Sequence, residues 1–145
     1  MDNDYKYPFF VVDASVIGGL GVFAAKEFIP GELVERCPVL RLERRVWGLS
    51  QNLDEHVVGM SARHTPISLP LGYGALYNHS DAPNADWTVS VTPALMEVRA
   101  KTLIPVGAEI LIDYGSAFFK ARNILSKTCI DPANASMSDA ESAIR

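Results

Sequence analysis

The sequence predicts a mainly β domain built from several short twisted sheets, with one or two short helices. Short apolar runs alternate with proline and glycine turns along most of the chain, as at Ile29-Pro30-Gly31. Only one long stretch, Trp47–Arg63, has apolar residues at helical spacings of three and four. The 145 residues are 48% hydrophobic and 21% charged, which is enough to bury a core in one domain.

The expected elements follow in order along the chain. Strands are predicted at Phe9–Asp13, Val22–Ala25, Glu32–Leu42, Trp87–Thr92, Leu95–Arg99 and Glu109–Tyr114. Helices are predicted at Trp47–Arg63, which Thr65-Pro66 would end, and at Phe118–Leu125. The single domain is expected to span residues 1–125. The small, polar tail 126–145 is expected to be poorly ordered or to complete a substrate channel.

One segment of the chain is echoed later in the sequence. Ala25–Leu33 reads AKEFIPGEL, and Ala100–Ile110 reads AKTLIPVGAEI. Both have the pattern of a strand, a Pro/Gly turn and a second strand. The echo predicts two similar hairpins that pack about a local pseudo-twofold axis, within a single domain rather than a repeat array.

Composition excludes several classes of protein. The two cysteines, Cys37 and Cys129, form no CxxC pair, so common cysteine-rich zinc modules are excluded and no metal is expected. No apolar run approaches the roughly 20 residues needed to cross a bilayer, and Met1–Asp4 has no signal-peptide core. An intracellular, soluble protein is the expectation. The net charge of −4 suits a basic peptide partner better than nucleic acid or a membrane surface.

Three motifs carry the functional information. They are Gly19-Leu20-Gly21, the run from Asn78-His79-Ser80 to Pro83-Asn84, and Glu109 to Tyr114-Gly115. In this order and spacing they resemble the signatures of SET-domain protein lysine methyltransferases. The resemblance runs from Val16 to Phe119 and is closest to the minimal viral-type SET proteins, which lack pre-SET and post-SET zinc modules. It implies a β-clip fold with a pseudoknot-like crossing of the chain. It also implies methyl transfer from S-adenosylmethionine, with S-adenosylhomocysteine as product, to the Nζ atom of a lysine.

The resemblance assigns cofactor binding to residues of all three motifs: Gly19, Leu20, Gly21, Asn78, His79 and Tyr114. Two glycines would let the cofactor approach the backbone and would permit unusual dihedral angles, although a plain hairpin turn has the same pattern. An asparagine amide both donates and accepts, which suits the amino-acid end of the cofactor. A histidine in this place also suggests a catalytic base, but the resemblance implies a binding and architectural role. Pro83 and Asn84 are expected to lock the crossing of this loop beside the final strand.

Tyr114 is the expected catalytic residue. Methyl transfer to an amine is an in-line displacement, which a protein catalyses by alignment. The tyrosine hydroxyl and backbone carbonyls would contact the polarised methyl through weak C–H···O bonds. Asp113 should point to the opposite face of its strand and act as a structural hydrogen-bond acceptor, as should Glu109. Residues expected to line the substrate channel are Ile112, Phe118, Phe119, Tyr73 and His56.

The expected partner is a lysine-bearing peptide segment, with a histone tail as the leading candidate. Action on histones would place the protein in the nucleus, and another substrate would place it in the cytoplasm. One alternative is a methyltransferase for a non-histone protein such as a ribosomal protein. Another is a non-catalytic β-clip module of the SAF-like type, which would share the Ile-Pro-Gly-Glu turn but would not need Asn78, His79 and Tyr114 together. A degenerate SET domain that only binds partners is a third. A homodimer is a further expectation, because a chain without a post-SET module needs another wall for its channel.

Overall fold

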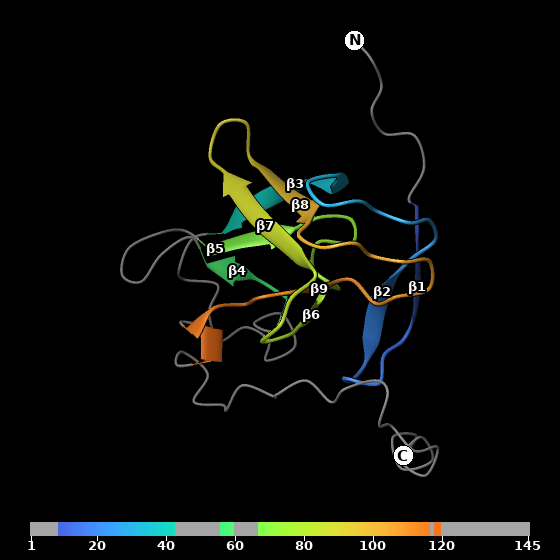
Figure 1. The fold of residues 1–145 in the computed structure, drawn as a ribbon. Coiled ribbons are helices and arrows are strands. Elements are labelled where there is room, and N and C mark those ends of the chain that lie inside the picture. The colour runs from blue at the N-terminus through green and yellow to red at the C-terminus, as the bar shows by residue number, and fades with distance from the viewer. Residues whose placement is uncertain (1–8, 43–55, 60–66, 117, 120–145) are drawn as a thin grey trace.

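The structure, a computed structural model, describes residues 9–42, 56–59, 67–116 and 118–119. Within these ranges it is almost entirely β, with nine strands in three sheets and a helical turn that begins at Ser116 (Figure 1). The predicted mainly β architecture of short sheets is therefore confirmed. No helix in the described part of the chain has the length and apolar character required to cross a membrane.

The first sheet is a hairpin of β1 (Phe10–Ala14) and β2 (Leu20–Ala24). The two strands are antiparallel, with Phe10 opposite Ala24 and Ala14 opposite Leu20. Gly19, in the connecting loop, has a φ of +63°, which an L side chain rarely adopts. The loop is closed by the Ser15 N–H, which donates to the Gly19 carbonyl at 2.9 Å.

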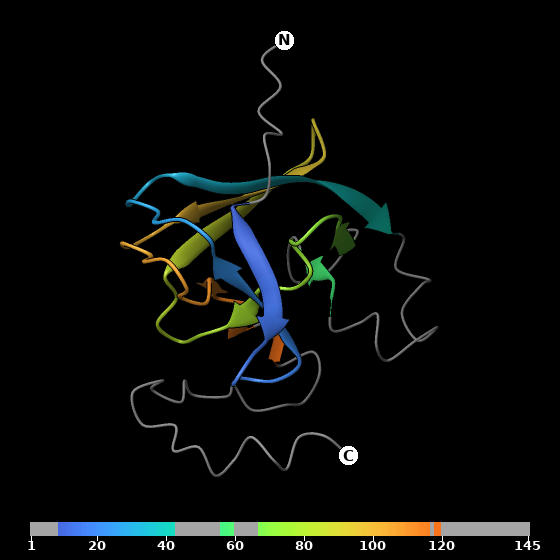
Figure 2. The ribbon, with the colours of Figure 1, turned by 90° about the vertical axis from the view of Figure 1, so that its right-hand side faces the viewer.

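The second sheet has five antiparallel strands in the order β4-β5-β3-β8-β7. Their bounds are β3 Leu33–Leu42, β4 Val58–Gly59, β5 Ile67–Pro70, β7 Ala85–Ser90 and β8 Leu95–Ala100. The long β3 is the middle strand (Figure 2): residues 33–38 pair with β8, and residues 39–42 pair with β5. Leu33 lies opposite Arg99 and Glu35 opposite Val98, so Val34 is an extra residue in a β-bulge. The bulge changes the face that the following side chains present, Glu35 included.

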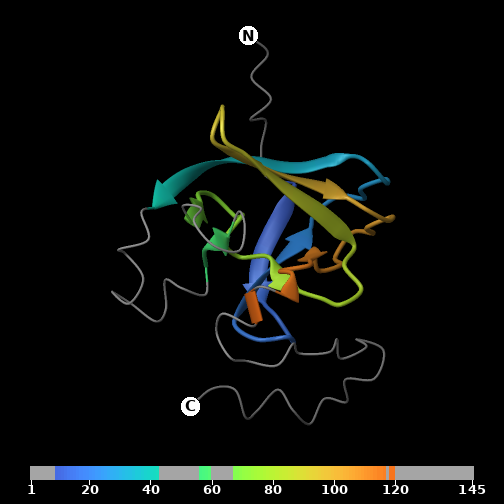
Figure 3. The ribbon, with the colours of Figure 1, turned by 90° about the vertical axis from the view of Figure 1, so that its left-hand side faces the viewer.

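The third sheet is a parallel pair, β6 (Asn78–His79) with β9 (Leu111–Ile112), which lie side by side in Figure 3. Asn84 holds this crossing together. Its Nδ2 donates to the Glu109 carbonyl, and its Oδ1 accepts from the Leu111 N–H, both at 2.8 Å. The side chain therefore acts as one further strand residue beside the start of β9. The predicted role of Asn84 at the chain crossing is confirmed.

The two echoed segments pack against each other with reciprocal hydrogen bonds. Phe28 and Ile104 each donate an N–H to the other's carbonyl at 2.9 Å. The Gly31 N–H donates to Ala100 O, and the Gly107 N–H donates to Ala24 O, both at 2.7 Å. Both glycines have positive φ, +85° and +81°. This exchange of equivalent bonds is what a local twofold produces, so the predicted packing of the two hairpins is confirmed.

The core lies between the five-stranded sheet and the two small sheets. Its fully buried side chains, each under 2% exposed, include Tyr77, Phe28, Met96, Ile104, Ile110 and Ile112. They come from both echoed segments, from β8 and β9, and from the residue before β6. Formation of the core therefore requires β6 and β9 to be placed correctly.

The helix predicted at Trp47–Arg63 is wrong where the structure describes it. Val58–Gly59 is strand β4, with Val58 opposite Ser68 and Gly59 opposite Ile67 of β5. A β-branched residue followed by glycine is poor in helix, and pairing with the edge of β5 supplies the backbone hydrogen bonds that a helix would have made. Residues 43–55 and 60–66 lie outside the described ranges. In the predicted helix at Phe118–Leu125, Phe118 and Phe119 are helical, and the rest lies outside those ranges.

Candidate active site

The glycine loop and Asn78 are joined by the carboxylate of Glu109. Its Oε1 accepts from Asn78 Nδ2 at 2.8 Å, and its Oε2 accepts from Ser15 Oγ at 2.9 Å. Asn78 Nδ2 also donates to the carbonyl of Leu20 at 3.0 Å. Glu109 is thus a structural acceptor, as expected, and it fixes the loop between β1 and β2 against β6.

Gly21 is glycine for a reason that the sequence did not reveal. A Cβ there would stand 2.2 Å from Glu109 Oε1 and 3.1 Å from the Ser15 Cβ. The missing side chain therefore makes room for the Glu109 carboxylate, not directly for a ligand. Gly19 differs, because a Cβ there would meet nothing within 4 Å and the positive φ is what favours glycine.

The residues around this loop fit the amino-acid end of S-adenosylmethionine. Both partners of Asn78 Nδ2 are acceptors, which fixes the orientation of the amide. Among the described residues no donor is bonded to Asn78 Oδ1, so this oxygen is available to an ammonium group. Leu20 is 56% exposed beside it and offers apolar surface.

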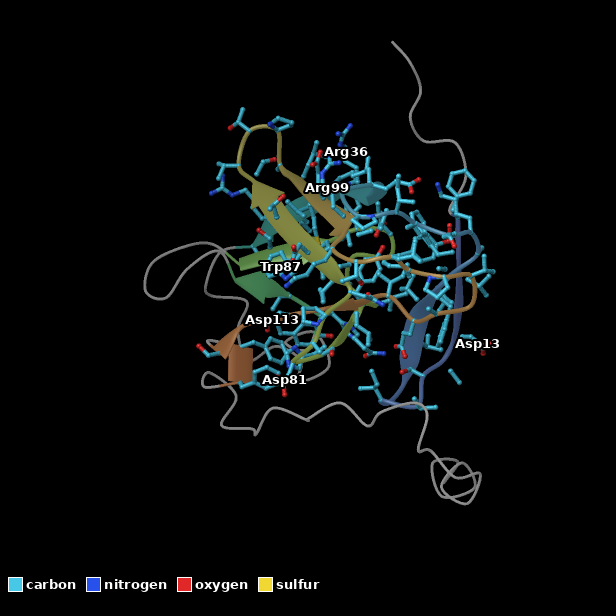
Figure 4. The ribbon with its side chains drawn as sticks, in the orientation of Figure 1. Asp13, Arg36, Asp81, Trp87, Arg99 and Asp113 are labelled. Atoms are coloured by element: carbon cyan, nitrogen blue, oxygen red, sulfur yellow. The ribbon has the colours of Figure 1, made fainter. Side chains whose placement is uncertain are left out.

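His79 is held in one tautomer. Its Nδ1 accepts the backbone N–H of Tyr114 at 3.1 Å, so this nitrogen carries no proton. Its Nε2 lies 3.0 Å from Asp81 Oδ1 and therefore donates the ring N–H to that carboxylate. Asp81 and Asp113 both lie in the same lower part of Figure 4, and Asp113 Oδ1 is 3.7 Å from His79 Nδ1. With its basic lone pair used by Tyr114, the ring positions β9 and does not act as a base.

Tyr114 is held by hydrogen bonds at both its backbone and its side chain. Besides the bond to His79, its hydroxyl donates to the carbonyl of Tyr77 at 2.5 Å. A carbonyl only accepts, so the hydroxyl proton points at Tyr77 and the oxygen lone pairs point elsewhere. Tyr114 is consequently presented as an acceptor, which is the role that C–H···O contact with a polarised methyl requires.

Aromatic rings surround Tyr114. Its ring centroid lies 4.6 Å from that of Phe118, 5.3 Å from that of His79 and 6.4 Å from that of Phe119. Phe119 also meets His79 edge-on at 4.7 Å. All three partners had been predicted for the site. The cluster forms an apolar surface of the kind that can pack along a lysine stem.

The turn after β9 is fixed from two sides. Asp113 Oδ1 accepts from the Gly115 N–H at 2.7 Å, and Gly115 has a φ of +77°. Trp87 Nε1, on β7, donates to the Asp113 carbonyl at 2.7 Å, and Trp87 lies above Asp113 in Figure 4. Asp113 is therefore a structural acceptor, as expected. Trp87, predicted only as the start of a strand, holds the backbone beside Tyr114.

The other three predicted channel residues have contacts of their own. Tyr73 packs edge-on against Phe10 with centroids 4.7 Å apart. His56 is exposed, and its Nδ1 donates to the Ala75 carbonyl at 2.8 Å. Ile112 is 1% exposed and belongs to the core. The structure thus brings Phe118 and Phe119 into ring contact with Tyr114, and the channel roles of Tyr73 and His56 stay predictions.

A partly buried carboxylate that contacts Tyr73 and Tyr77 was missed by sequence reasoning. Glu35 accepts from the Tyr77 hydroxyl at 2.8 Å and from the Tyr73 N–H at 3.0 Å. Burial raises the pKa of Glu35 above its usual 4.5, and the two hydrogen bonds oppose that shift. Burial and the Glu35 charge together raise the pKa of the neighbouring Cys37 thiol to about 12, and burial likewise raises the pKa of Tyr77 well above 10. Glu35 stands among other charged residues of the predicted strand Glu32–Leu42, so no pattern in the sequence singled it out.

The raised pKa of Glu35 predicts a specific pH dependence of stability. Between 4.5 and its folded pKa, the native protein holds a proton on Glu35 that the unfolded chain has lost. The contribution of Glu35 to the free energy of unfolding is therefore fully present below pH 4.5 and falls as the pH rises through the folded pKa. Tyr77 and Cys37, which face it, stay neutral across this window. Urea unfolding from pH 4 to 8 should show the wild type losing stability relative to Glu35→Gln as pH rises. Parallel curves would contradict the assignment.

The described residues hold no group of three or more His, Cys, Asp or Glu side chains that could bind a metal ion. The arrangement instead offers an open acceptor at Asn78, an exposed apolar loop and an oriented tyrosine hydroxyl. Such a site can bind and align reactants.

The comparisons with known proteins agree with this geometry. The sequence model of the SET domain matches residues 19–115. No curated protein matches the chain. Among solved structures, the chain is similar to a Plasmodium falciparum protein named as a candidate histone methyltransferase, with 34% sequence identity and a TM-score of 0.63. The match covers 76% of this chain and 96% of that one. The chain belongs to the SET-domain family.

Proposed function

We propose that the protein transfers a methyl group from S-adenosylmethionine to the Nζ atom of a lysine in a peptide segment of another protein. The observation that carries this proposal is the hydroxyl of Tyr114, whose proton is directed to the Tyr77 carbonyl, so that its oxygen is oriented as an acceptor. Family membership supports methyl transfer, and the described site fits the cofactor.

When bound, S-adenosylmethionine supplies a methyl group on a cationic sulfonium. Asn78 Oδ1 would accept from its ammonium group, and the backbone of Gly19-Leu20-Gly21 would lie against its amino-acid end. Tyr114 Oη would face the methyl and align it through weak C–H···O contact. Glu109 would hold Asn78 and the glycine loop in position while these contacts form.

The lysine stem would pack against Phe118 and Phe119 and reach Tyr114 along their rings. A free lysine has a pKa of about 10.4 and must lose its proton before it attacks. A desolvated aromatic channel beside a cation lowers the lysine pKa through burial and through like charge. Water then takes the proton, since the lone pair of His79 Nδ1 is already used. Alignment of the amine and the methyl supplies the larger part of the catalysis.

A histone tail is the leading substrate. The support is that the similar Plasmodium falciparum protein is named for histones, together with the net charge of −4, which favours a basic peptide. If histones are the substrate, the protein acts in the nucleus. The peptide would bind in extended form, as an added strand.

Methyl transfer from radiolabelled S-adenosylmethionine tests the proposal. Core histones, offered separately, and a whole-cell protein extract serve as acceptors, and acid hydrolysis identifies the labelled amino acid. We expect label in methyllysine, with one protein as the main acceptor. Label confined to an extract protein would keep the reaction and exclude histones. Binding of S-adenosylmethionine without label on any protein would exclude the proposed activity.

A further inference from the structure

Glu35 and Tyr77 connect the five-stranded sheet to the hydroxyl of Tyr114. Glu35 Oε2 accepts from the Tyr77 hydroxyl at 2.8 Å, and the Tyr77 carbonyl accepts from the Tyr114 hydroxyl at 2.5 Å. Tyr77 therefore links Glu35 to Tyr114: its side chain binds Glu35, and its backbone carbonyl binds Tyr114. Its ring is 1% exposed and forms part of the core.

Glu35 fixes the segment before β6 at two points. Its Oε1 accepts from the Tyr73 N–H at 3.0 Å, while its other oxygen holds Tyr77. Between these points the Leu76 N–H donates to the Tyr73 carbonyl at 2.8 Å and closes a turn. Gly72, with a φ of +85°, precedes this segment, and a Cβ there would be 2.9 Å from Glu35 Oε1. The segment therefore closes tightly around one carboxylate, which determines where the Tyr77 backbone lies.

We propose that Glu35 and Tyr77 are positioning residues for methyl transfer. The Glu35 carboxylate anchors the Tyr77 side chain, so that the Tyr77 carbonyl holds the Tyr114 hydroxyl in its acceptor orientation. The inference rests on the proposed function for its effect on rate, but the geometric link stands independently of it. Neither Glu35 nor Tyr77 touches a reactant in this scheme. Their effect on the reaction passes through Tyr114 Oη.

The physical reason is that the orientation of the Tyr114 hydroxyl depends on the position of its acceptor, the Tyr77 carbonyl. If Tyr77 shifts, the Tyr114 hydroxyl is free to rotate and donate to another group, and its lone pairs no longer face the methyl. The ground-state contacts at Asn78 and the glycine loop do not depend on this orientation. Loss of the anchor should therefore lower kcat and leave the binding of S-adenosylmethionine unchanged.

Two substitutions test the link. Tyr77→Phe removes the hydroxyl that binds Glu35 and keeps the ring. Glu35→Gln keeps the size of the side chain and replaces the carboxylate. It provides the test if Tyr77→Phe fails to fold. Glu97→Gln is the matched control, because Glu97 lies on neighbouring β8 and pairs with Arg36 and Arg99 at the surface. We expect Tyr77→Phe and Glu35→Gln each to lower kcat about tenfold, with the Kd for S-adenosylmethionine within about twofold of wild type.

The double variant and a spectroscopic signal distinguish positioning from mere stability. Glu35→Gln with Tyr77→Phe should lower kcat about as much as Tyr77→Phe alone, because Glu35 acts on Tyr114 through the Tyr77 hydroxyl. 3-Fluorotyrosine placed at position 114 should give a ¹⁹F line that shifts or broadens in both variants and stays unchanged in Glu97→Gln. An unchanged kcat and an unchanged ¹⁹F line, with only a lower Tm, would overturn the inference. If the wild type methylates nothing, the proposed function fails, and the ¹⁹F line alone decides whether Glu35 and Tyr77 hold the Tyr114 hydroxyl.

Discussion

Tyr114→Phe is expected to lower methyl transfer by on the order of 10²-fold or more, in kcat and kcat/KM alike. The change removes one oxygen that contacts the methyl group in the transition state and leaves the phenyl ring in its aromatic cluster. The backbone bond from Tyr114 N to His79 does not involve the side chain and should persist. Single-turnover assays with radiolabelled S-adenosylmethionine measure the chemical step directly.

The affinity for S-adenosylmethionine is the necessary control for Tyr114→Phe. Calorimetry should give a Kd close to that of the wild type, since Asn78 and the glycine loop are unchanged. Removal of the hydroxyl also leaves the Tyr77 carbonyl without this donor, which should lower the free energy of unfolding by about 1–3 kcal/mol. Full methyl transfer by the variant would exclude a catalytic role for Tyr114.

Gly21→Ala is expected to abolish measurable binding of S-adenosylmethionine. Its Cβ would stand 2.2 Å from Glu109 Oε1, well inside contact distance, so the carboxylate must move. Movement breaks the bonds from Glu109 to Asn78 and Ser15, which hold the loop in place. The Asn78 amide then loses its fixed orientation, and overpacking lowers the free energy of unfolding by about 1–3 kcal/mol. Calorimetry and urea unfolding measure the two effects separately.

Gly31→Ala is the matched control for this change. Gly31 precedes β3 and has a φ of +85°, and a Cβ there would meet nothing within 4 Å. Alanine at this position costs about 1–2 kcal/mol in backbone strain and touches no part of the site. It should lose stability and keep its affinity for S-adenosylmethionine. Equal affinity in Gly21→Ala and the wild type would show that the Glu109 carboxylate does not organise the cofactor loop.

Local motifs in the sequence predicted the centre of the site well. Asn78, Tyr114 and the two phenylalanines lie in short, compact patterns, and the structure brings the last three together around His79. The strands with alternating apolar residues were also predicted, to within a few residues at their ends. In these cases the residues of a segment are enough to predict its structure or its role, without knowledge of distant contacts.

The supporting residues could not be predicted in the same way, because their roles arise from distant contacts. Glu109 binds Ser15 from 94 positions away along the chain. Glu35 faces inward because of a β-bulge at Val34, and a bulge has no reliable signature in a single sequence. The two-residue strands β4 and β6 are too short to show a period of two, so they exist only through their partners. The wrong helix prediction at Val58–Gly59 has the same origin.

The reciprocal turns around Phe28 and Ile104 also determine at which point of its synthesis the protein can bind S-adenosylmethionine. The turn around Phe28 leaves the ribosome long before the turn around Ile104. Until then it cannot form the hydrogen bonds that join the two turns. The cofactor loop likewise lacks its carboxylate anchor until Glu109 has emerged. Closing such long loops is the slow part of folding for a chain of this kind. No nascent fragment that stops short of β9 should therefore retain S-adenosylmethionine, and binding should appear in one step once β9 has left the ribosome.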